Sequence, residues 1–168
     1  MTERVVQSQC KDSQLDSISS ALLGQALQCV TTKGEFHLAM STASSLNDLY
    51  ARLMYDPDLR AMPWNKTHVW FFGCVAADDS IQCAITAHSG ILEEHVHQVC
   101  KPLPPGTTID CCICDGEDLS HLRVEFLDTC DSLLVLAKNQ DTLDSVRSVA
   151  SSSVVHLFIL EPTIQENH

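Results

Sequence analysis

Small hydroxyl side chains gather at one point of the sequence, where they could hold a phosphate group. The segment 41–45 reads Ser-Thr-Ala-Ser-Ser and joins an apolar run, 36–40, to a segment with helical spacing, 46–53. In a parallel sheet, ligands bind beyond the carboxyl ends of the strands, where the N–H groups that begin a helix attract anions. The residues that we expect to contact such a ligand are Ser41, Thr42, Ser44 and Ser45.

The same loop has a second interpretation. It contains no glycine, and glycines usually let a loop wrap closely around a phosphate. An ordinary strand-to-helix turn, in which Ser44 or Ser45 caps the helix, therefore stays an alternative.

Histidines and cysteines that could bind a metal ion stand in two groups. If the segment 93–100 is helical, its two histidines point to opposite sides, and cysteines that alternate along a buried strand also face opposite ways. A Cys/His nucleophilic pair has no local signature in the sequence. We therefore expect structural cysteines, no metal site and no cofactor. The residues considered are His95, His97, Cys100, Cys111, Cys112 and Cys114.

The composition describes an acidic chain with enough apolar residues for a sizeable core. Its 168 residues are 45% hydrophobic, which predicts a single domain over 1–168 with its core within 15–160. The formal net charge is -12, and the ten Lys and Arg residues are scattered. Because nucleic acids and anionic membranes are held by clustered cations, neither is expected as a partner.

The amino-terminal sequence and the cysteine count indicate a cellular compartment. The first residues, MTERVVQSQCKDSQ, have no apolar core of the kind that a secretory signal needs. No run approaches the roughly 18 apolar residues of a membrane-spanning helix. We therefore expect a cytoplasmic protein whose nine cysteines are reduced thiols.

The spacing of apolar residues predicts strands that alternate with helices. Apolar residues recur at helical spacing over 12–30 and 46–53, and 81–99 reads as one helix or two short ones broken near Gly90. A serine-rich helix is expected over 143–152. Such alternation produces crossover units, so the fold class is α/β with a mostly parallel sheet of about five strands. The strands are predicted at 35–40, 67–72, 109–114, 132–137 and 154–160.

Three stretches of the sequence carry a pattern that is more specific than any single residue. LAMSTASSLNDLY contains a strand, the Ser-rich loop and a helix with Leu-Tyr. PWNKTHVWFF places Trp64 and His68 in a Trp-x-x-x-His strand, and IDCCICDGEDLSH begins a strand at Asp110 and reaches His121. In this order, over about 15–160, they resemble the 6-phosphogluconolactonase and glucosamine-6-phosphate isomerase family. The second stretch is especially close to the lactonase branch.

The resemblance implies a three-layer Rossmann-like domain with a site for a sugar phosphate. It implies that His121 is the base that activates water, because the family's histidine stands at this distance from the strand aspartate. It also places Asp110 among the substrate-binding residues, together with the Ser-rich loop.

Several positions depart from the family pattern, and the departures reduce positive charge. The Ser-rich loop lacks both glycines and the proline of the family loop. Gly73, Cys74 and Val75 stand in place of an Asp-Glu-Arg triplet, which removes a phosphate-facing cation and two acids, and Asp141 stands in place of an arginine. A phosphorylated sugar would therefore meet repulsion where the family offers attraction.

These departures favour a non-catalytic module that binds or regulates a protein partner and retains at most weak affinity for a sugar phosphate. On this hypothesis His121 is a vestige of the catalytic base. The alternative is an active lactonase that hydrolyses 6-phosphogluconolactone in the pentose phosphate pathway. Enzymatic activity therefore stays open at this point.

Overall fold

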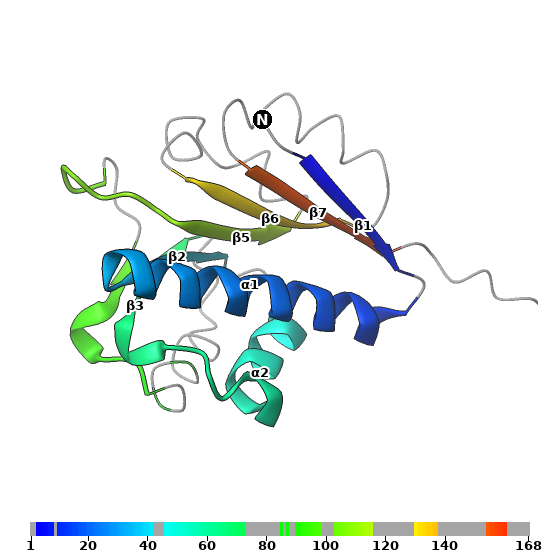
Figure 1. The fold of residues 1–168 in the computed structure, drawn as a ribbon, viewed down its shortest axis with the longest axis horizontal. Coiled ribbons are helices and arrows are strands. Elements are labelled where there is room, and N and C mark those ends of the chain that lie inside the picture. The colour runs from blue at the N-terminus through cyan, green and yellow to red at the C-terminus, as the bar shows by residue number, and fades with distance from the viewer. Residues whose placement is uncertain are drawn as a thin grey trace, which may run out of the picture.

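A parallel sheet of seven strands runs through the described part of the chain (Figure 1). The order across the sheet is β1-β7-β6-β5-β2-β3-β4, and each neighbouring pair is parallel. The strands are β1 (Glu3–Ser8), β2 (Phe36–Ser41), β3 (Thr67–Phe72), β4 (Val96–Gln98), β5 (Cys111–Asp115), β6 (Ser132–Ala137) and β7 (Val154–Leu160).

This computed structural model describes part of the sequence. The residues described are 3–8, 10–41, 46–72, 85, 87, 90–98, 103–115, 130–137 and 154–160. Strands β1 and β7 are described by their backbone only. All statements below concern these residues.

The α/β fold class and the parallel sheet agree with the prediction, and all five predicted strands are present. Strands β3, β6 and β7 have the predicted bounds. Strand β2 begins at Phe36 and β5 at Cys111, slightly later than expected. The helix predicted over 143–152 lies outside the described residues.

Strands β1 and β4 were not predicted. Strand β1 is largely polar and pairs with β7 alone, so backbone hydrogen bonds rather than an apolar pattern define it. The helix expected over 81–99 is wrong at its carboxyl end, where a 3-10 turn (Glu93–His95) leads into β4. A strand of three residues is too short to show a period of two, and its pairing with β3 decides its conformation.

Helix α1 (Lys11–Lys33) covers one face of the sheet (Figure 1). Its buried apolar residues recur at helical spacing, at Leu15, Ile18, Leu22 and Ala26. The helix ends where Gly34 adopts a left-handed backbone (φ 86°) and donates its N–H to the carbonyl of Val30. Polar residues alternate with the apolar ones, and no helix in the described ranges combines the length and apolarity needed to cross a membrane.

Helix α2 (Asn47–Tyr55) packs on the same core as α1. It buries Leu49, Tyr50 and Leu53. Two 3-10 turns, Pro57–Leu59 and Trp64–Lys66, then carry the chain to β3. Together α1, α2 and these turns shield the apolar side chains on one face of β2, β3, β5 and β6.

The opposite face of the sheet carries a different set of side chains. Successive residues of a strand point to opposite faces, so Phe36 and Leu38 lie in the core under the helices while His37 between them points away. Strands β2 and β3 pair with His37 opposite His68, which puts both rings on this second face. The pairing of β3 with β4 adds His97 opposite Trp70.

Asp110 connects the amino-terminal ends of two central strands, β2 and β5. Its buried carboxylate accepts a hydrogen bond from the N–H of His37 at 2.8 Å and another from Lys33 Nζ. Its own N–H donates to the carbonyl of His37 at 2.9 Å. Burial alone lowers the pKa of the Lys33 ammonium, but the hydrogen bond and the charge of Asp110 outweigh it, and the pKa is raised. One carboxylate thus joins the end of α1 to β2 and β5.

We predict that shortening a buried side chain of α1 destabilises the folded chain. Leu22→Ala removes a fully buried side chain and should lower the free energy of unfolding by about 2–5 kcal/mol. Leu27→Ala, on the exposed side of the same helix (41% exposed), should change it by less than about 0.5 kcal/mol. Urea denaturation followed by circular dichroism measures both values. Equal losses would contradict the packing of this face.

The Lys33–Asp110 contact gives a second stability prediction. Lys33→Met leaves the buried Asp110 carboxylate with one partner fewer and should cost about 1–3 kcal/mol in urea denaturation. Combining it with Asp110→Asn should cost less than the sum of the two single changes, because they share one interaction.

A matched control is Lys66→Met, which changes an exposed lysine just before β3. It should leave the free energy of unfolding nearly unchanged. If Lys33→Met and Lys66→Met were equally mild, the ion pair would not hold this edge of the sheet.

Candidate functional site

The Ser-rich loop follows the carboxyl end of β2, where the sequence predicts a ligand. Ser41 is the last residue of that strand and is buried, and its carbonyl accepts a 2.6 Å hydrogen bond from the Tyr50 hydroxyl. Thr42, Ser44 and Ser45 lie outside the described residues. The capping position of α2 is occupied by Leu46, which has no side-chain capping bond, rather than by a serine. The Ser41–Tyr50 bond therefore joins strand and helix around the loop.

Asp110, the other described residue that was expected at the site, lies at the opposite edge of the sheet. Asp110 lies just before β5, opposite His37 at the amino-terminal edge of the sheet, while Ser41 ends β2 at the carboxyl edge. The carboxylate of Asp110 is already engaged by Lys33 and by the β2 backbone. Its contact with a substrate stays a prediction, as does the role of His121, which lies outside the described residues.

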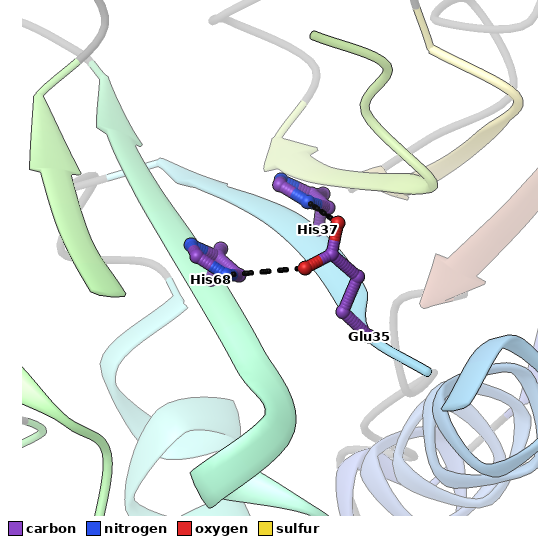
Figure 2. A group of neighbouring side chains, drawn as sticks. All are labelled: Glu35, His37 and His68. Atoms are coloured by element: carbon purple, nitrogen blue, oxygen red, sulfur yellow. Dashed lines mark hydrogen bonds and ion pairs between the residues drawn. The ribbon is translucent and has the colours of Figure 1, made fainter. Parts of the chain in front are cut away.

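A second group of polar side chains lies at the amino-terminal edge of the sheet (Figure 2). Glu35 directly precedes β2, His37 is the second residue of β2, and His68 is the second residue of β3. Figure 2 shows the carboxylate of Glu35 turned toward both rings. We call these three residues the Glu-His-His cluster.

The distances within the Glu-His-His cluster are short. One oxygen of Glu35 lies 3.0 Å from Nε2 of His37, and the other lies 3.5 Å from Nε2 of His68. The two imidazole rings are stacked with centroids 4.6 Å apart and planes 5° from parallel. All three side chains can place a ligand atom within 4.8 Å of the others.

Further rings surround this cluster. Nδ1 of His68 is hydrogen-bonded to Nε2 of His97 at 3.0 Å, and the ring of His95 stacks on His68 with a centroid distance of 3.8 Å. Trp70 stacks on His97 and donates its indole N–H to Nδ1 of His37 at 3.2 Å. Within the described part of the chain, Nδ1 of His95 is buried with no hydrogen-bond partner.

Burial favours the neutral form of two of these rings, His68 and His97. Burial lowers the pKa of His68 to about 4, and the positive charges of His37 and His95 act in the same direction. Burial likewise lowers the pKa of His97. The hydrogen bond from His37 lowers the pKa of Glu35, against a smaller effect of burial. At neutral pH the site therefore presents the neutral imidazoles of His68 and His97 near the Glu35 carboxylate.

Sequence reasoning did not bring these residues together. It grouped His95 and His97 with cysteines, whereas Cys111 and Cys112 are buried within β5 and burial raises the pKa of both thiols. The only signal for the cluster was that His37 and His68 each stand second in a strand. That signal becomes informative only once β2 and β3 are known to be neighbours in register.

Comparisons with known proteins identify the architecture. No protein-family model matches the sequence, and no curated protein matches it at a significant level. The crystal structure of devB protein matches with a TM-score of 0.70 at 12% identity, covering 99% of this chain and 100% of that chain.

Two further solved structures are 6-phosphogluconolactonases. The one from Thermotoga maritima has a TM-score of 0.69 at 13% identity and covers 94% of this chain and 100% of that chain. The one from Leishmania guyanensis has a TM-score of 0.66 at 11% identity and covers 99% of each chain. Identities this low establish the architecture alone, and they agree with the three sequence stretches that suggested it. The chain therefore has the 6-phosphogluconolactonase-like fold.

Proposed function

We propose that this chain is a non-catalytic binding or regulatory module built on the 6-phosphogluconolactonase-like fold. The fold supports a ligand site at the carboxyl edge of the sheet, where β2 passes into the Ser-rich loop. The distribution of positive charge argues against lactone chemistry at that edge. A protein partner is the ligand that we propose.

The positions of the cations carry this proposal. Among the described side chains, Lys33 is held by Asp110 at the amino-terminal edge, and Arg52 is held between α2 and α1 by Asp12 and Asp16. The other two described cations, Arg60 and Lys66, lie on the segment that leads into the amino end of β3. A phosphorylated sugar requires a cation that points toward the Ser-rich loop. None of these four cations is placed to bind a phosphate there.

The carboxyl end of β3 supports the same interpretation. Strand β3 ends at Phe72, so Gly73, Cys74 and Val75 come next, where the family pattern has Asp-Glu-Arg. These residues cannot contribute a positive charge to a phosphate. With a net charge of -12, the chain as a whole also repels anionic ligands.

The cysteines support a cytoplasmic location for this module. Among the described residues, Cys29, Cys111, Cys112 and Cys114 form no disulfide, and the last three are buried. Buried thiols of this kind are stable in a reducing compartment. We therefore propose the cytoplasm as the compartment in which the module binds its partner.

An active lactonase is the second candidate function. It is favoured by the likeness to solved 6-phosphogluconolactonases over nearly the whole chain, and by the presence of His121 at the family's spacing from Asp110. Cations outside the described side chains, Arg123 and Arg147 among them, would then have to supply the charge.

A hydrolysis assay separates the two candidates. We expect the purified chain to hydrolyse 6-phosphogluconolactone no faster than the uncatalysed reaction, because the charge that stabilises the phosphate and the oxyanion is missing. The measurement is the proton release on hydrolysis. The Thermotoga maritima enzyme, assayed in parallel, is the positive control.

The control variant for this assay is His121→Ala. If the wild-type chain turned over the lactone and His121→Ala abolished the activity, the chain would be an enzyme and our proposal would be wrong. If the wild-type chain and His121→Ala both leave the rate of lactone hydrolysis at its uncatalysed value, the proposal is supported, since neither protein then contributes a catalytic base.

The missing cation can be restored as a test of the charge argument. We expect 6-phosphogluconate at millimolar concentration to raise the Tm of the wild-type chain by less than about 1 °C, and that of Val75→Arg by about 2 °C. Val75→Gln, of similar length but uncharged, should behave as the wild type. A large shift for the wild-type chain would contradict the proposed loss of phosphate binding.

A further inference from the structure

We propose that Glu35, His37 and His68 form a binding site for a divalent transition-metal ion of the zinc type. The Glu-His-His cluster lies at the amino-terminal edge of the sheet, at the opposite end of β2 from the Ser-rich loop. The site is therefore separate from the ligand site at the carboxyl edge. Its existence does not depend on whether the chain is an enzyme.

The spacing of the ligand atoms fits such an ion. With bond lengths of about 2.0–2.1 Å, two ligand atoms of a tetrahedral zinc ion lie about 3.3 Å apart. The two oxygen-to-nitrogen distances of the cluster, 3.0 Å to His37 and 3.5 Å to His68, bracket that value. A nitrogen binds a metal in the plane of its own ring, so the two rings, which are stacked and nearly parallel, must turn toward each other before both can bind the ion.

The chemistry and exposure of the cluster also suit a metal ion. Two imidazoles and one carboxylate are a ligand set that zinc and its neighbours in the periodic table accept. The side chain of Glu35 is 53% exposed and those of His37 and His68 are 18% and 19% exposed, so an ion can enter from solvent. Three protein ligands leave a fourth position for water.

His97 prepares His68 for binding. Nδ1 of His68 is hydrogen-bonded to His97, and when His68 carries its proton on Nδ1, its Nε2 is free to bind the ion. Such partners fix the orientation of a ligand ring and usually change metal affinity by a factor of about 10–100 when removed. His95, whose ring stacks on that of His68, further restricts the orientation of His68.

Trp70, in contrast, opposes metal binding at His37. Its indole N–H donates to Nδ1 of His37, and with Nδ1 as the acceptor the proton of the ring is on Nε2, facing Glu35. Nε2 can bind an ion only after it has lost this proton. The proton of the neutral ring is then on Nδ1, where it faces the indole N–H, and two donors that face each other repel. Removing the indole N–H should therefore strengthen binding, which an ordinary core role of Trp70 would not predict.

Cobalt titration of the full-length chain tests the proposal. Co²⁺ is added alone to metal-free protein in a reducing buffer without a chelator, and its visible absorption distinguishes nitrogen and oxygen ligands from thiolates. We expect one equivalent of Co²⁺ with a spectrum that lacks thiolate charge transfer. Zn²⁺ should displace it at one equivalent.

Two variants change proposed ligands, and two change residues that are hydrogen-bonded to the ligand rings. Glu35→Gln and His68→Ala should weaken Co²⁺ binding by about tenfold or more, and His97→Ala by about tenfold. Trp70→Phe should tighten it by about fivefold, the net effect of one hydrogen bond. Circular dichroism confirms that each variant is folded, and Glu35→Gln changes an exposed side chain whose loss should not unfold the chain.

The matched control is Asp58→Asn, which neutralises an exposed carboxylate on the 3-10 turn after α2. It should bind Co²⁺ as the wild type does. If Glu35→Gln behaved like Asp58→Asn, or if the spectrum showed thiolate ligands, the proposed site would be refuted. Binding that Glu35→Gln and His68→Ala both weaken, together with a wild-type response of Asp58→Asn, supports it.

Discussion

The in-register parallel pairing of β2 with β3 is the constraint on which the rest of the structure depends. It aligns Leu38 and Met40 with Val69 and Phe71 of β3 in the core that α1 and α2 cover. The same register sets His37 beside His68 on the opposite face. A shift by one residue would turn both sets to the wrong side, so the core and the Glu-His-His cluster share one cause.

The two ends of this pair of strands have different roles. At the carboxyl end, the Tyr50 hydroxyl holds the last carbonyl of β2 and so joins strand and helix around the Ser-rich loop. At the amino end, Asp110 binds Lys33 and the β2 backbone. Tyr50 and Asp110 belong to the family-like pattern of the sequence, and the structure gives each a contact that stabilises the scaffold. Residues of such a pattern can therefore have a structural role, whether or not they also bind a ligand.

The same reasoning explains how the fold can be shared with solved structures at 9–13% identity. Burial on the helix side requires apolar residues of suitable size rather than particular ones. Phosphate binding requires specific charges at specific positions, and the described cations are engaged or lie elsewhere. The hydrophobic pattern can therefore specify the sheet without fixing a phosphate site.

The sequence by itself determined the α/β class, the five long strands and helix α1, because apolar periodicity and the glycine after Lys33 are local signals. It did not reveal β1 or β4, because a polar edge strand and a three-residue strand are defined by their partners. It named Asp110 but not its contacts. Only the tertiary structure decided that Glu35, His37 and His68 are neighbours, since the distance between residues on different strands depends on strand order and register.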